Sequence, residues 1–290
     1  MPHNLILALL VLFPLDFPSH EKNAAFRDVI DQGLAVGETR VKLAEPTFRD
    51  DQNAEQQHAA LVKIAGSTRG ADEMLRDSIS APHKLRTKDV KTEGAVIRIV
   101  ELEFVLRGLD LDAIKPEEMF DKLGGDPVDV ANMRYEVRVL KADDLKGSAV
   151  AAKLSDHEWL IHAKGRLLDR IAVESTDRVV VSRTQDSLVF ASRSDPKFGP
   201  DSPFPNRWST ITQKSTGDVF GPAQAYDGTI GYVKMTKLKG LENAVVVESH
   251  LAFAEPSAWF QGAPILRSKF GLIAQDQIRR LRRELHKSKP

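Results

Sequence analysis

Alternating apolar and polar side chains predict strands from residue 95 onward. Within residues 95–107, Val100 and Leu102 fall on one face of an extended chain, and Glu101 and Glu103 fall on the other. The same pattern predicts further short strands over residues 135–140, 159–163, 167–174, 178–184, 188–193, 208–213, 231–238 and 244–253. Short polar turns separate these strands, so antiparallel pairing is expected.

Helical spacing of apolar residues appears at both ends of the chain. It predicts helices over residues 23–34, 54–65, 71–79 and 116–123, with a polar connection over 80–93. From residue 264 the pattern is helical to the end, and its apolar stripe comprises Phe270, Ile273, Ala274, Ile278, Leu281 and Leu285. A charge introduced by Leu281→Asp is therefore expected to unfold the domain. The basic residues over 279–289 are expected to form an ordinary solvated helix face.

Together these elements predict an α+β fold. A curved antiparallel sheet packs on a long C-terminal helix, and N-terminal helices precede it. The predicted organisation is a signal peptide over residues 1–19, a helical subregion over 20–93 and an antiparallel domain over 94–290.

An apolar run of nine residues, LILALLVLF at positions 5–13, stands near the N-terminus. Its length suits the core of a signal peptide and is well short of the roughly 20 residues of a membrane-spanning helix. We therefore expect an exported protein, periplasmic or extracellular, with no transmembrane anchor and a loss of about 18 to 25 residues on maturation. The alternative is a buried first helix or strand, since no Lys or Arg precedes the run and no A-x-A cleavage pattern follows it.

Composition and charge exclude several classes of function. An apolar fraction of 42% and a charged fraction of 28% are typical of a globular protein. The 41 basic and 41 acidic residues leave no net charge to attract nucleic acid. The absence of cysteine excludes disulfides, thiolate zinc sites and cysteine nucleophiles. No G-x-x-x-x-G-K-[ST], G-x-G-x-x-G or G-x-S-x-G motif occurs, so no cofactor is expected.

Two pairs of polar residues carry candidate catalytic chemistry. Glu101 and Glu103 lie two apart on a predicted strand, which places them on one face about 6 to 7 Å apart, close enough to share acid and base roles or a cation. Glu248 and His250 have the same relation, and a carboxylate near an imidazole can tune it as a base. Such pairs commonly solvate the outer face of a sheet, and we expect that here. The alternative is a hydrolase-type enzyme that uses these four side chains.

The sequence HEWLIH at 157–162 is similar to the HExxH zinc motif, but its histidines are five residues apart. On a helix this spacing would turn the side chains about 140° apart, and on a strand they would face opposite sides. One zinc ion could not bind both. We therefore expect no metal site, and interpret His157 and His162 as solvent-facing residues of a strand.

Trp259 and Phe260 are adjacent aromatic residues in the predicted loop before the last helix. Large rings at such a place must bury against the protein core or against a ligand. We expect them to plug one end of the sheet, with the wall of a ligand pocket as the alternative. Arg267 and Lys269 follow near the helix start, where they could contact an anion or simply be solvated. These four residues are the candidate ligand-binding residues.

The C-terminal third resembles a group of exported bacterial proteins of unknown function. The resemblance rests on GYVKMTKL at 231–238, VVVESHLAFAEP at 245–256, and WFQGA followed by LRSK before the long helix. It implies no known activity. The order of the elements, antiparallel strands followed by a long helix, is similar to the START-like helix-grip architecture, in which a sheet wraps the helix and leaves an apolar cavity.

This resemblance implies a non-catalytic exported protein that binds an apolar small molecule or lipid between sheet and helix. The loop with Trp259 and Phe260 would then lie at the cavity mouth. Besides the enzyme, a structural or interaction module of the cell envelope is the remaining alternative. No nucleic-acid partner is expected, and the sequence predicts no particular oligomeric state.

Overall fold

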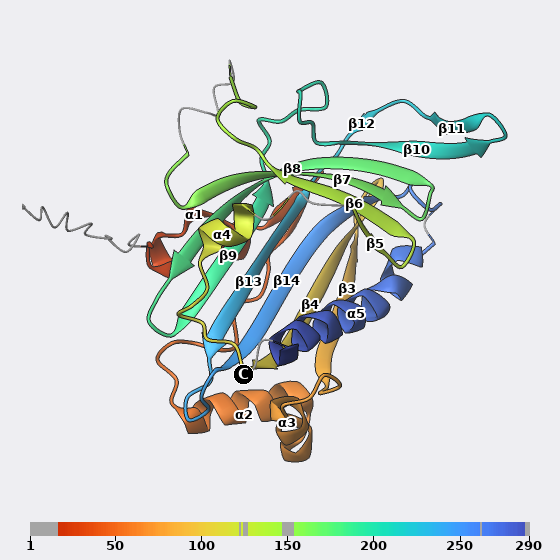
Figure 1. Ribbon diagram of the computed structural model, residues 1–290. Helices are drawn as coiled ribbons and strands as arrows, with labels where there is room; N and C mark the ends of the chain where they lie inside the picture. The colour runs from red at the N-terminus through yellow and green to blue at the C-terminus, as the bar shows by residue number, and fades with distance from the viewer. Residues whose placement is uncertain (1–16, 122, 124–126, 147–153, 262, 288–290) are drawn as a thin grey trace, which may run out of the picture.

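A large antiparallel sheet forms the centre of the protein, as the computed structural model in Figure 1 shows. The structure describes residues 17–121, 123, 127–146, 154–261 and 263–287, so the apolar run at 5–13 lies outside the described residues. The strands of the sheet are β3 (His83–Lys91), β4 (Ala95–Arg107), β5 (Val128–Val130), β6 (Met133–Val139), β7 (Glu158–Leu167), β8 (Ile171–Arg183), β9 (Ser187–Ser194), β10 (Arg207–Lys214), β11 (Gly217–Phe220), β12 (Gln224–Ala225), β13 (Thr229–Lys237) and β14 (Ala244–Pro256).

The remaining elements lie at the two ends of the chain and in one connection. The helices are the 3₁₀ helix η1 (His20–Lys22), α1 (Ala24–Asp31), α2 (Ala54–Ala65), α3 (Thr68–Leu75), α4 (Pro116–Asp121) and α5 (Ile265–Lys287). A small separate hairpin consists of β1 (Leu34–Val36) and β2 (Thr39–Val41). Among the described residues, no helix is long and apolar enough to cross a membrane.

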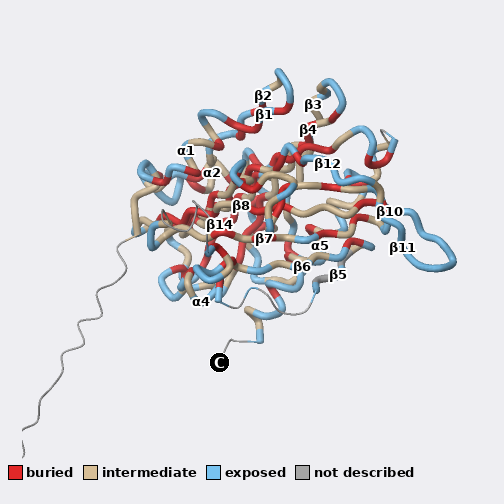
Figure 2. Tube along the Cα trace, turned by 90° about the horizontal axis from the view of Figure 1, so that it is seen from above, coloured by how far each residue is buried: buried red, intermediate tan, exposed pale blue. Residues whose placement is uncertain are grey.

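The strand order is β3-β4-β14-β13-β9-β8-β7-β6-β5, and every pairing is antiparallel. The longest ladder joins β4 to β14, from Ala95 opposite Pro256 to Arg107 opposite Ala244. β10 pairs with β8 beyond the end of β9, and its hairpin with β11 projects from the body with all of β11 exposed (Figure 2). The structure confirms the predicted α+β fold with an antiparallel sheet and a C-terminal helix.

Both faces of the sheet are covered. We call the inner face the one that α5 crosses, as seen from the front in Figure 1, and the outer face the opposite one. On the inner face, Ile278 of α5 belongs to one apolar cluster with Phe104 and Val247. On the outer face, Leu61 of α2 clusters with Val105 of β4. Helix α1 packs on the same outer face, against β8, β9 and β13.

The predicted polar connection over 80–93 is wrong, because β3 forms within it. β3 lies at the edge of the sheet and pairs with β4 alone. Lysines at 84, 88 and 91 interrupt its apolar pattern, and no residue of β3 is fully buried. Charged side chains are a common feature of edge strands, where they oppose pairing with other chains. The first strand of the sheet therefore lies inside the range assigned to the helical subregion.

The terminal helix forms as predicted, but its buried side differs from the expected stripe. Leu281 is 48% exposed, so the prediction that a charge at this position unfolds the domain is wrong. The buried residues follow the i, i+4 row Leu266, Ala274, Ile278 and Arg282. Arg282 is only 4% exposed, which also corrects the expectation that the basic run is solvated throughout.

The guanidinium of Arg282 hydrogen-bonds to backbone carbonyls near the start of β3. It donates to the carbonyl of Ala81 and, at 3.0 and 3.3 Å, to the carbonyl of Val105. The first residue of β3 pairs with Phe104, so the residues of β4 after Phe104 have no partner in β3. Arg282 therefore satisfies backbone acceptors that the sheet leaves open, and burial lowers its pKa because the charge is taken out of water.

We expect Arg282→Ala to lower the free energy of unfolding by about 1 to 3 kcal/mol, because buried carbonyl groups lose their donors. Leu281→Asp, one residue earlier on the exposed side, should change it by no more than about 0.5 kcal/mol. Urea denaturation of the two variants beside the wild type measures both values. A larger loss for Leu281→Asp than for Arg282→Ala would contradict this orientation of α5.

Candidate functional site

An apolar cavity of about 430 Å³ lies between the inner face of the sheet and α5. It reaches from β6, β7 and β8 on one side to β14 and the helix on the other. Its lining consists of Met133, Tyr135, Ala163, Gly165, Leu167, Val173, Ser175, Asp177, Tyr226, Thr229, Leu251, Phe253, Trp259, Leu266, Phe270 and Ile273. Most of these side chains are aliphatic or aromatic, so the cavity suits an apolar occupant.

Small residues at the centre of β7 help to explain why the inner face is hollow here. Ala163 and Gly165 occupy inner-face positions of β7, and their small size leaves space between the sheet and α5. A Cβ at Gly165 would lie 3.1 Å from the ring of Tyr135, so the absent side chain makes space for that ring. On the other side of the cavity, Leu251 is 37% exposed although β14 has a partner strand on each edge. An aliphatic side chain that is exposed in the middle of a sheet offers an apolar surface that a ligand can cover.

One residue of the aromatic pair before α5 belongs to the wall of this cavity. Trp259 and Phe260 are both buried, at 5% and 4% exposure. The Trp259 ring stacks on Tyr226 with centroids 5.7 Å apart and meets Trp208 edge-on at 6.1 Å. Trp259 lines the cavity, whereas Phe260 packs in the surrounding apolar core. Trp259 is therefore part of the apolar core and also part of the pocket wall, so both interpretations apply to it.

The two basic candidates lie away from the cavity lining. Arg267 is half exposed, and its Nη1 is 3.3 Å from Asp89 Oδ2. Lys269 is partly exposed on the first turns of α5. Ligand contacts of Arg267 and Lys269 therefore stay a prediction.

One carboxylate, that of Asp177 on β8, lies in the cavity wall. Its Oδ1 accepts hydrogen bonds from Ser175 Oγ at 2.8 Å and Ser194 Oγ at 2.7 Å. Thr229 Oγ1 is 3.4 Å from Oδ2. Burial raises the pKa of Asp177, against the effect of the three hydroxyl donors.

Sequence reasoning missed Asp177 because it placed a turn between residues 174 and 178. β8 instead runs unbroken from Ile171 to Arg183. The signal that could have found it is the alternation of Val173, Asp177 and Val179 on one face of a continuous strand.

The four candidate catalytic residues come together on the outer face. Glu248 lies opposite Glu103 in the ladder of β4 and β14, and His250 lies opposite Glu101. The expectation that they are solvated is wrong for three of them, because Glu103 and Glu248 are fully buried and His250 is 3% exposed. Glu101 is partly exposed and receives a hydrogen bond from Arg86 Nε at 2.8 Å.

The chain between β2 and α2 crosses this cluster and buries it. The backbone N–H groups of Thr47 and Phe48 donate to the two carboxylate oxygens of Glu248, at 2.7 and 3.1 Å. The hydroxyl of Tyr232 donates to the carbonyl of Ala44 at 2.8 Å. These contacts attach an N-terminal segment to the sheet, and no local pattern in the strands could reveal such a cover.

Burial shifts the pKa values of the cluster away from their ordinary range. It raises the pKa of Glu248 to about 7, although the two backbone N–H groups and the charge of Lys234 act in the opposite direction. It lowers the pKa of His250 to about 4, and Glu101 opposes this effect. The His250 ring stacks on Tyr232 with centroids 4.7 Å apart, and within the described part of the chain neither of its nitrogens has a hydrogen-bond partner.

The histidines of the HEWLIH segment also differ from expectation. His162 is 2% exposed on β7, and its Nδ1 is 2.8 Å from the hydroxyl of Thr176. His157 is partly buried against the ring of Phe17. Within the residues that the structure describes, no group of three or more His, Asp or Glu side chains is arranged to hold a metal ion.

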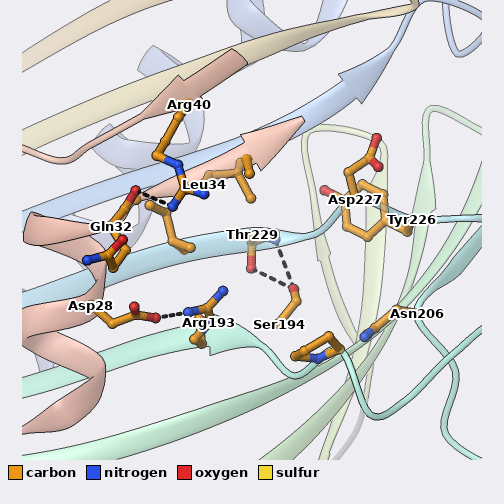
Figure 3. A pocket seen from close by; sticks show the side chains of 14 residues that line it. Asp28, Gln32, Leu34, Arg40, Arg193, Ser194, Asn206, Tyr226, Asp227 and Thr229 are labelled. Carbon is orange, nitrogen blue, oxygen red and sulfur yellow. Dashed lines mark hydrogen bonds and ion pairs between the residues drawn. The ribbon is translucent and has the colours of Figure 1, made fainter. Parts of the chain in front are cut away.

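A polar pocket of about 310 Å³ lies beside the start of β13 (Figure 3). In it, Arg193 forms an ion pair with Asp28, and Arg40 donates to a backbone carbonyl at 3.1 Å. Tyr226 and Thr229 line both this pocket and the apolar cavity. The two hollows are therefore neighbours that share part of one wall.

No protein-family model matches the chain, and no curated protein matches it in sequence. Among solved structures, the chain is similar to a STAR-related lipid transfer protein from Xanthomonas axonopodis, with 12% identity and a TM-score of 0.37, over 67% of this chain and 98% of that one. It is also similar to the lipid transfer and protein localization domain of human StarD13, with 8% identity and a TM-score of 0.38, over 69% of this chain and 88% of that one.

Proposed function

We propose that the protein binds an apolar small molecule or lipid in the cavity between the inner face of the sheet and α5, without catalysing a reaction. The observation that carries this proposal is the apolar cavity itself. Its volume of about 430 Å³ lies within the roughly 300–1,000 Å³ of small-molecule sites. Leu251 supports the proposal, because an aliphatic side chain that is 37% exposed inside a sheet loses its contact with water when a ligand enters.

The arrangement of the polar cluster favours binding over catalysis. Glu101, Glu103, Glu248 and His250 do converge, as an enzyme would require. However, each carboxylate oxygen of Glu248 accepts a hydrogen bond from a main-chain N–H, and the chain around Thr47 covers the cluster. A substrate would have to displace this segment to reach the carboxylates. We therefore assign the cluster a role in holding the N-terminal segment on the outer face.

The cavity proposal can be tested with the neutral apolar dye Nile red and a variant that fills the cavity. Ala163→Phe places a ring in the hollow above β7, and we expect it to weaken dye binding at least about tenfold, equivalent to about 1.4 kcal/mol. Ala172→Phe is the matched control, because Ala172 lies on the outer face of the adjacent strand. Fluorescence titration measures both. Equal binding by the two variants, or no binding by the wild type, would refute the proposal.

We also propose that the protein is exported and belongs with the exported bacterial proteins that its C-terminal third resembles. The support for export is the apolar run at positions 5–13. Residues just after it have specific contacts: the carbonyl of Pro18 accepts from the backbone N–H of Arg183, and the guanidinium of Arg183 lies over the ring of Phe17. We infer that a removed leader ends at or before Asp16, so that these contacts remain.

The mass of the mature protein from its native host tests export. We expect a loss of no more than about 16 residues, fewer than the roughly 18 to 25 expected from the leader alone. An intact Met1, or a mature chain that begins after Phe17, would contradict this assignment.

A further inference from the structure

The cavity wall contains a single charged group in the described part of the chain. The sixteen lining residues include Asp177 and no Lys, Arg or His. No basic side chain lies within ion-pair distance of Asp177 among the described residues, and its only described polar partners are the hydroxyls of Ser175, Ser194 and Thr229. Asp177 is only partly exposed. A carboxylate that has lost part of its hydration to an apolar cavity, with no cation beside it, costs stability.

The two oxygens of this carboxylate are not equally engaged. Oδ1 accepts two short hydrogen bonds, from Ser175 and Ser194. Oδ2 has one long contact, to Thr229 at 3.4 Å. Since a carboxylate oxygen has two acceptor sites, Oδ2 retains capacity for a further donor. Ser194 Oγ in turn accepts a hydrogen bond from the backbone N–H of Thr229 at 2.9 Å (Figure 3). This bond holds the Ser194 hydroxyl in position to donate to Asp177, and Thr229 belongs to the wall that the cavity shares with the polar pocket.

A donor without a partner lies in the same cavity. The indole N–H of Trp259 is buried and has no hydrogen-bond partner among the described residues. Tyr226 connects the two groups: its ring stacks on Trp259, and burial followed by the charge of Asp177 raises its pKa. An acceptor with spare capacity, Asp177 Oδ2, and an unpartnered donor, the indole N–H of Trp259, therefore belong to residues that line the same largely apolar cavity. A ligand hydroxyl could donate to one and accept from the other.

From this arrangement we propose that Asp177 anchors the polar end of the ligand, and that the ligand is an apolar molecule with an uncharged hydrogen-bond donor, such as a long-chain alcohol, and not a free fatty acid. The proposal rests on the function proposed above, because it assumes that the cavity binds a ligand. A carboxylate head would place a second negative charge beside Asp177 with no cation to compensate it. An ester head has no hydrogen-bond donor for the carboxylate of Asp177.

Competition against Nile red with lauryl alcohol, lauric acid and methyl laurate at pH 8 tests the proposal, since these compounds share one alkyl chain. We expect the alcohol to bind at least about tenfold more tightly than the acid, and more tightly than the ester. In Asp177→Asn, the preference of alcohol over acid should shrink several-fold, chiefly because the acid binds better. The melting temperature should stay the same or rise, since the substitution removes an uncompensated charge.

Asp227→Asn is the matched control, because Asp227 lines the polar pocket and is not among the residues that line the apolar cavity. It should leave the alcohol preference of the wild type unchanged. Equal binding of alcohol and acid by the wild type would overturn the Asp177 assignment while leaving the cavity proposal intact, and this outcome needs no variant to fold. Failure of Nile red and all three compounds to bind would overturn both.

Discussion

Trp259→Ala is expected to lower the free energy of unfolding by roughly 3 to 5 kcal/mol, the usual cost of removing a large buried aromatic ring. Trp259 is 5% exposed and contacts the rings of Trp208, Tyr226 and Phe260. These neighbours belong to different segments of the chain, so they cannot all move to fill the space that the indole leaves. The apolar cavity should therefore grow instead of collapsing.

Leu251→Ala provides the control for this experiment. Leu251 lines the same cavity but is 37% exposed, so its truncation removes few packing contacts. We expect a loss of at most about 1 kcal/mol. Equilibrium denaturation in urea measures both values. If Trp259→Ala were no less stable than Leu251→Ala, the ring would not be part of the core, and Trp259 would serve only as a pocket wall.

Acidification should destabilise the protein through His250 by about 2 to 3 kcal/mol between pH 6.5 and pH 4. Burial lowers the pKa of His250 from 6.5 to about 4. As the pH falls through 6.5, the unfolded chain therefore binds a proton at this residue while the folded chain does not. The stability is complete above pH 6.5 and is lost progressively until the folded form is protonated near pH 4.

The variant His250→Phe isolates this effect, because it keeps a ring against Tyr232 but cannot titrate. Glu248, whose pKa is raised to about 7, stabilises the folded state as the pH falls, but it does so in both proteins. The difference in unfolding free energy between variant and wild type should thus grow towards pH 4. His58→Phe is the control, since the side chain of His58 is 43% exposed on α2. A difference for His250→Phe that does not vary with pH would contradict the lowered pKa, because it would show that this imidazole is protonated as readily in the folded protein as in the unfolded chain.

Strands and helices with regular patterns could be predicted from the sequence. β4 and α2 form over the predicted residues because their apolar positions repeat with one clear period. β3 was missed because an edge strand buries little, and charged side chains then hide its period. The turn expected inside β8 was wrong for a related reason: Ser175 and Asp177 interrupt the apolar alternation, although they face the same cavity as Val173.

The candidate site could be predicted only in part. The aromatic loop was identified because two adjacent large rings must bury somewhere, and Trp259 does line the cavity. The burial of Glu248 and His250 could not be predicted, because it depends on a segment some 200 residues earlier in the chain that hydrogen-bonds to Glu248. Similarly, Arg282 was expected in solvent because the carbonyls that hold it, those of Ala81 and Val105, come from elements distant in sequence.

Native mass spectrometry of the protein purified from its own host, followed by organic extraction, shows directly whether the cavity binds a ligand. We expect a bound species that adds a discrete mass to the wild type, dissolves in organic solvent and carries a hydroxyl or another neutral donor group. The added mass should be absent from Ala163→Phe and present in the outer-face control Ala172→Phe. A wild-type protein that carries no added mass, and that takes up no apolar compound when one is supplied, would contradict the assignment of the cavity as a binding site.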